Sequence, residues 1–96
     1  RVSTIQDQTK ESQDLAAAAL VEAINEIKIS AETPNVNTAK LAEARTLHRE
    51  AQWYLDFIIV TNGYGFHNPT ETLNNLNIAM DKAYKASKLA REARDK

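Results

Sequence analysis

His67 lies in a predicted turn between two helices, a position that suits a metal ligand. His67 lies in a short stretch that also holds both glycines, Gly63 and Gly65, and one of the two prolines, Pro69. The stretch separates two long helix-like runs, so the imidazole comes just before the start of a helix. An imidazole fixed in such a turn can offer a neutral nitrogen to a metal. The alternative is that His67 is an ordinary residue ahead of a helix cap.

The second histidine and the nearby carboxylates suggest structure more than chemistry. His48 falls on the apolar side of a predicted helix, which is typical of a core or interface histidine hydrogen-bonded to a partner. No His-Glu-x-x-His motif occurs, so a zinc hydrolase is unsupported. A di-iron bundle would need a Glu-x-x-His motif on a second helix, and no second helix offers one. The carboxylates of the second predicted helix, Glu43, Glu50 and Asp56, are therefore interpreted as solvated or paired charges. Asp56 interrupts a very apolar run and must therefore be paired or hydrogen-bonded, and it is interpreted as a structural anchor for a neighbouring backbone group or imidazole.

The remaining motifs exclude several classes of site. Gly63 and Gly65 follow a predicted helix and lack the further glycine and lysine of a phosphate loop. Trp53 and the tyrosines could stack on a planar ligand, although aromatic core residues are commoner. The chain has no cysteine. It therefore forms no disulfide and no thiolate metal site, and it cannot attach haem through a Cys-x-x-Cys-His motif of its own.

Length and composition describe one small domain. The chain has 96 residues, a net charge of -1, 43% hydrophobic residues and 26% charged residues, so it is neither disordered nor membrane-spanning. The balanced charge argues against a nucleic-acid binder. The basic excess of the last sixteen residues fits a helix C-terminus, where cations are favoured. Because the chain starts at Arg1 without a methionine or signal peptide, we expect a processed product or a piece of a longer protein.

Helical periodicity accounts for nearly the whole chain, beginning with a helix near Ser3, which has capping-box spacing to Gln6. This helix is expected to end at the polar segment 30–35, which contains Pro34. Its predicted core stripe consists of Ala16, Leu20, Ala23 and Ile27.

A second helix is predicted to start near Asn37 or Thr38 and to end at Gly63, a plausible left-handed cap. Residues 53–60 leave almost no polar face, and a three-helix chain of this size can hardly cover them. The missing cover would be a second subunit, a large cofactor or a domain outside this chain. The heptad-like seam of this helix consists of Leu41, Ala44, His48, Ala51, Leu55 and Ile58.

A third helix has the clearest start, because Asn68 is a good cap, Pro69 suits the first helical position and Glu71 has capping-box spacing. No strand is predicted. The fold class is therefore all-α, with three long helices of which the second and third form an antiparallel pair joined at residues 63–67. The seam of the third helix consists of Leu73, Leu76, Met80, Ala83, Ser87 and Ala90.

Three stretches, in their order and spacing, resemble the C-terminal helical region of the ammonia-forming cytochrome c nitrite reductases, a multihaem cytochrome c family. The resemblance is strongest over residues 51–83, and the earlier helix is compatible with it. The stretches are Ala51-Gln52-Trp53-x-x-Asp56, then Gly65-Phe66-His67-Asn68-Pro69 with Glu71 and Leu73, then Ala79-Met80-Asp81-Lys82-Ala83.

The resemblance implies a periplasmic enzyme that reduces nitrite to ammonium with six electrons, carries five c-type haems and forms homodimers through long C-terminal helices. It implies that His67 is the distal axial ligand of a bis-histidine haem c, which is attached through a part of the protein not in this chain. The implied partners are the haem-bearing N-terminal part, a second copy meeting the second and third helices, and a donor cytochrome or quinol dehydrogenase. No nucleic acid is expected.

The departures from the family are equally informative. The Cys-x-x-Cys-His motifs, the lysine-ligated active-site haem and the catalytic Arg, Tyr and His of the family are absent, so this chain alone is expected neither to bind haem covalently nor to reduce nitrite. It is interpreted as a C-terminal fragment, residues 1–96 forming a single helical segment. Two alternatives stay open: the tail of an octahaem nitrite- or hydroxylamine-type relative, and a free-standing helical self-association module without a cofactor.

Overall fold

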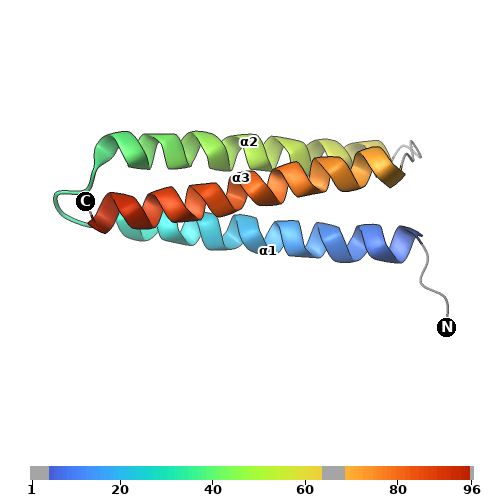
Figure 1. Cartoon of the computed structure of the whole chain (residues 1–96), viewed down its shortest axis with the longest axis horizontal. Coiled ribbons are helices and arrows are strands. Elements are labelled where there is room, and N and C mark those ends of the chain that lie inside the picture. The colour runs from blue at the N-terminus through green and yellow to red at the C-terminus, as the bar shows by residue number, and fades with distance from the viewer. Residues whose placement is uncertain (1–4, 64–68, 96) are drawn as a thin grey trace.

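The computed structural model describes the backbone of residues 5–63 and 69–95, and the side chains of residues 10–61 and 70–95. These residues form three α-helices, α1 (Ile5–Ala31), α2 (Thr38–Gly63) and α3 (Pro69–Asp95), and contain no strand. The helices run alternately up and down an elongated bundle of 51 × 26 × 16 Å (Figure 1). The all-α fold expected from helical periodicity is confirmed.

The third helix is the centre of the bundle. The contact between α2 and α3 is the most extensive, that between α1 and α3 is nearly as large, and that between α1 and α2 is much smaller. Figure 1 shows α3 running between the other two helices and antiparallel to α2. The predicted antiparallel pair is therefore confirmed, while α1 and α2 face each other across a more open side.

The turn between α1 and α2 differs slightly from the prediction. Helix α1 continues through Ser30 to Ala31, because the amide of Glu32 still donates to the carbonyl of Lys28 at 3.2 Å. Asn35 takes the left-handed conformation that asparagine tolerates, with φ of 60°. Asn37 then caps α2, its Oδ1 accepting a hydrogen bond from the amide of Lys40 at 3.1 Å. The predicted caps Ser3 and Asn68 lie outside the described residues.

All three predicted seams face the core, which is built largely from alanine. Small side chains allow helix axes to approach closely, and five alanines along α3 are completely buried. Of the predicted seam residues, only His48, Leu73 and Met80 keep partial exposure. One core cluster contains Ala16, Ala19, Leu20, Ala51, Leu55, Ile58, Leu76 and Ala83, and the other contains Ile27, Leu41, Ala44, Ala90 and Ala93.

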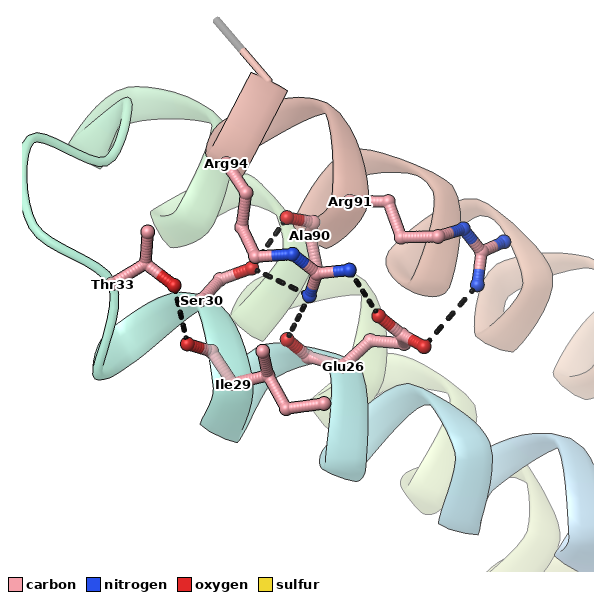
Figure 2. A network of polar contacts seen from close by, with 7 residues as sticks. All are labelled: Glu26, Ile29, Ser30, Thr33, Ala90, Arg91 and Arg94. Carbon is pink, nitrogen blue, oxygen red and sulfur yellow. Dashed lines mark hydrogen bonds and ion pairs between the residues drawn. The ribbon is translucent and has the colours of Figure 1, made fainter.

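A polar network ties the end of α1 to the end of α3 (Figure 2). The hydroxyl of Ser30, which is fully buried, donates to the carbonyl of Ala90. Arg94 donates from Nη1 to Ser30 Oγ and to the carbonyl of Glu26, both at 3.2 Å, and its Nη2 lies 2.8 Å from Glu26 Oε1. Arg91 adds a longer contact of 3.6 Å to Glu26 Oε2. We call these residues, Glu26, Ser30, Ala90, Arg91 and Arg94, the C-terminal clamp.

Candidate functional site

The predicted ligand His67 lies in residues 64–68, outside the described part of the chain. Its neighbours in sequence are where the motif predicts them, because α2 ends at Gly63 and α3 begins at Pro69. The role of His67 therefore stays a prediction.

The last three turns of α2 expose large apolar side chains. Trp53 is 60% exposed, Phe57 43% and Val60 54%, and helical spacing places these three residues on one side of α2. Ile59 is equally exposed on another side. The prediction that three helices cannot cover this segment is confirmed. No helix in the described part of the chain is long and apolar enough to span a bilayer.

The aromatic residues of α2 form a stacked group on the surface. The ring of Trp53 lies parallel to that of Phe57, with centroids 5.5 Å apart and planes 11° apart. Tyr54 meets Trp53 edge-on at 5.1 Å and 88°. Trp53 thus lies on the surface of the bundle, as expected for the segment that three helices cannot cover, and is not one of the commoner aromatic core residues.

The carboxylates of α2 behave as paired or solvated charges. Glu50 Oε1 lies 2.9 Å from Lys82 Nζ on α3, and this hydrogen bond raises the pKa of Lys82 above its usual value. Asp56 is exposed, and its Oδ1 accepts a hydrogen bond from Gln52 Nε2 at 2.9 Å. The predicted partner of Asp56 was a backbone group or an imidazole, whereas the structure gives it a side-chain amide one turn earlier. Glu43 is solvated.

His48 lies half-buried on an apolar groove between α1 and α2. The groove has a volume of about 330 Å³ and is open to solvent. We call it the α1–α2 groove, and it is lined by Ala17, Leu20, Val21, Ile24, His48, Gln52 and Leu55. The predicted position of His48 on the apolar side of α2 is thus confirmed, whereas its role at an interface and its hydrogen-bond partner stay predictions. Among the described residues, no three His, Asp or Glu side chains come together in a way that could hold a metal.

The side chains of this chain could ligate a haem iron but could not attach a haem covalently. An imidazole can occupy an axial position on haem iron, and the assignment of that role to His67 stays a prediction. Covalent attachment needs cysteines, which this chain does not contain.

The α1 wall of the groove and the C-terminal clamp were not predicted from the sequence. The weak signal available for the groove wall was the pair of apolar residues Val21 and Ile24 beside the predicted core stripe of α1.

Comparison with known proteins gives a consistent result. The family described as Cytochrome c552 matches residues 1–96. A cytochrome c-552 of Desulfotalea psychrophila is 36% identical over 77 residues, which is 80% of this chain and 14% of that protein. The cytochrome c nitrite reductase subunit NrfA of Nitratidesulfovibrio vulgaris is 36% identical over 53 residues, which is 55% of this chain and 10% of that protein. No solved structure matches the chain.

These findings place the chain among the c-type cytochromes. More narrowly, it belongs to the cytochrome c552 family, in which cytochrome c nitrite reductases are found. The matched stretches span only a small part of the length of these two relatives, 14% of the first and 10% of the second.

Proposed function

We propose that this chain is the C-terminal helical part of an ammonia-forming cytochrome c nitrite reductase, an enzyme that reduces nitrite to ammonium with six electrons. The observation that carries the proposal is the family match along the whole chain. The three-helix bundle supports it, because two of its helices end on either side of the Gly-Phe-His-Asn-Pro motif.

Within this enzyme, His67 supplies the distal axial ligand of one haem c. A haem c held by His67 and a second histidine would supply one-electron transfer and would not bind nitrite. The contribution of this chain is to hold the imidazole between the ends of two helices and to tune the potential of the haem.

The exposed apolar side of α2 is an argument for two protein partners that would cover it. Trp53, Phe57 and Val60 need cover in the assembled protein, which the haem-bearing N-terminal part would supply. A second copy meeting α2 and α3 would make the homodimer. The enzyme would work in the periplasm and receive electrons from a donor cytochrome or quinol dehydrogenase.

The test of the haem role is the variant His67→Ala in the full-length protein that carries this sequence. We expect one haem to change from low spin to high spin, and electron delivery to slow, while the helices stay folded. His48→Ala is the matched control, because His48 lies on the α1–α2 groove away from the predicted ligand position, and it should leave the haem spectrum unchanged. An unaltered low-spin spectrum in His67→Ala would contradict the ligand assignment.

The intact mass and visible spectrum of the native polypeptide separate this function from its alternative. A chain much heavier than 10.7 kDa with a c-type haem spectrum supports the reductase. A colourless species of that mass, with no haem-carrying partner, would favour a free-standing self-association module, for which the exposed apolar side of α2 is the supporting observation.

A further inference from the structure

One end of the α1–α2 groove is basic. Lys28 follows the groove residue Ile24 by one turn of α1, and Arg45 precedes the groove residue His48 by one turn of α2. Because α1 and α2 are antiparallel, Lys28 and Arg45 flank the same end of the groove. Both side chains are exposed, and neither forms an ion pair with a carboxylate of the described residues. Arg49 adds a third exposed cation one turn after Arg45.

The carboxylates that border the groove lie at its opposite end. Asp14 precedes the groove residue Ala17 by one turn, and its Oδ2 lies 3.9 Å from Lys10 Nζ. Asp56 follows the groove residue Gln52 by one turn and accepts a hydrogen bond from it at 2.9 Å. The groove therefore has an apolar floor, unpaired cations at one end and carboxylates that already have partners at the other.

We propose that the α1–α2 groove and its basic end form the docking surface for an acidic protein that delivers electrons. Apolar side chains of this donor enter the groove, and its carboxylates meet Lys28 and Arg45. The inference rests on the proposed function, because a six-electron reduction needs a protein that supplies the electrons. Charge complementarity identifies the occupant: the unpaired cations attract an acidic surface, and the carboxylates at the other end repel it, which fixes the direction of docking.

The size of the groove fits a transient contact between redox proteins. Its lining residues run from position 17 to 24 on α1 and from 48 to 55 on α2, which is roughly 10 Å of each helix. An amphipathic helix presents its apolar positions i to i+7 over the same length. Val21 is 58% exposed and Ile24 46%, so they offer apolar surface to such a contact. Small interfaces of this kind are typical of weak electron-transfer encounters.

The groove lies on the helix that leads to the predicted haem ligand. From Arg45 to the end of α2 at Gly63 is roughly 27 Å of helix, which is about the diameter of a small domain. A donor anchored at Arg45 would therefore extend over the groove to the end of α2, where the Gly-Phe-His-Asn-Pro motif follows.

The first experiment uses the full-length protein with its haems, and reduced flavodoxin, an acidic redox protein, as the probe donor. Haem reduction is followed by stopped-flow absorbance at low ionic strength. We expect Lys28→Glu and Arg45→Glu each to slow it by at least about fivefold, and this difference to shrink as added salt screens the charges. Lys88→Glu on α3 is the matched control, because Lys88 is also exposed and does not line the groove. Equal rates for Lys28→Glu and Lys88→Glu would overturn the proposal.

Two isoleucines of α1 test the apolar part of the surface by binding alone. Ile24 lines the groove, whereas Ile29 lies outside it with nearly the same exposure, 46% against 49%. Surface plasmon resonance with oxidised flavodoxin should show binding weakened by at least about threefold in Ile24→Asn, because an amide would be buried without a partner. Ile29→Asn should bind like the unaltered protein. Equal binding by the two variants would contradict docking in the groove.

Reduction by sodium dithionite, a small reductant that needs no docking surface, checks the haems themselves. All variants should react with dithionite at the same rate, and a variant slowed with both reductants would count against docking. Loss of haem from Ile24→Asn would mean that the haem-bearing part covers the groove. A changed oligomeric state of Ile24→Asn in sedimentation velocity would mean that a second copy covers it, and either result would overturn the proposal.

The unaltered protein separates this inference from the proposed function. A haem protein that reduces nitrite, but whose reduction by flavodoxin is insensitive to Lys28 and Arg45, would refute the docking surface alone. A colourless protein would refute the reductase function itself.

Discussion

Ser30 and Ser87 are both fully buried, yet their hydroxyl groups meet different surroundings. Ser30 Oγ donates to the carbonyl of Ala90 and accepts a hydrogen bond from Arg94. Ser87 Oγ has no hydrogen-bond partner among the described residues. A buried hydroxyl contributes stability only where its hydrogen bonds are made, so the two serines should respond differently to the same substitution.

We expect Ser30→Ala to lower the free energy of unfolding by about 1–2 kcal/mol, since it leaves a carbonyl and a guanidinium without their partner. Ser87→Ala should be neutral or stabilising by up to about 1 kcal/mol, because it removes an unsatisfied hydroxyl and adds a better helix former. Urea unfolding followed by far-UV circular dichroism measures both. Equal destabilisation by the two substitutions would show that Ser87 has a partner.

At the scale of elements, the start of α2 depends on one side chain. Asn37 Oδ1 accepts from the amide of Lys40, and the backbone amide of Asn37 donates to the carbonyl of Ala93 at the end of α3 at 2.9 Å. The side chain therefore caps α2, while the backbone ties that cap to another helix.

Asn37→Ala should cost about 1 kcal/mol of stability, because the amide of Lys40 loses its acceptor. Asn37→Asp keeps an acceptor and places a negative charge at the helix N-terminus, so it should be as stable as the unaltered chain. Hydrogen exchange at the amides of residues 38–40 locates the effect. If these amides exchanged as fast in Asn37→Asp as in Asn37→Ala, and faster than in the unaltered chain, the capping role would be contradicted.

At the scale of the whole molecule, the C-terminal clamp holds together segments that are far apart in sequence. Arg94 contacts two groups of Glu26 and the hydroxyl of Ser30, and its side chain is 23% exposed. Arg91 contacts Glu26 only at 3.6 Å, and its side chain is 47% exposed. Hydrogen bonds to partly buried charged groups contribute more than exposed ion pairs, so the two arginines should differ in importance.

Arg94→Met should lower the free energy of unfolding by about 1–3 kcal/mol, because the carbonyl of Glu26 and its carboxylate lose their close donor. Arg91→Met, the control, should cost less than about 1 kcal/mol. Thermal unfolding gives both values, and hydrogen exchange should show that Arg94→Met opens the end of α1 first. Equal effects of the two substitutions would mean that only net charge matters at this end.

The sequence by itself determined the three helices, their buried stripes and the family. Helical periodicity, caps and breakers act within a few residues, so they can be read along the chain. Leu41, Ala44 and Ala51 were predicted as one seam and are buried together. His67 was singled out for a ligand role by its motif, and that role stays a prediction.

Only the tertiary structure decided which helix is central, which surfaces stay open and which polar groups meet. Glu26 and Arg94 are 68 positions apart, and no local pattern pairs them. The exposure of residues 53–60 was predicted from their apolar run, but only the structure showed that Trp53 and Phe57 stack on one open side of α2. The α1–α2 groove arises because α3 packs against both other helices and leaves them with little contact to each other. Such features depend on how whole helices pack, and packing is settled by contacts between distant segments that local periodicity does not encode.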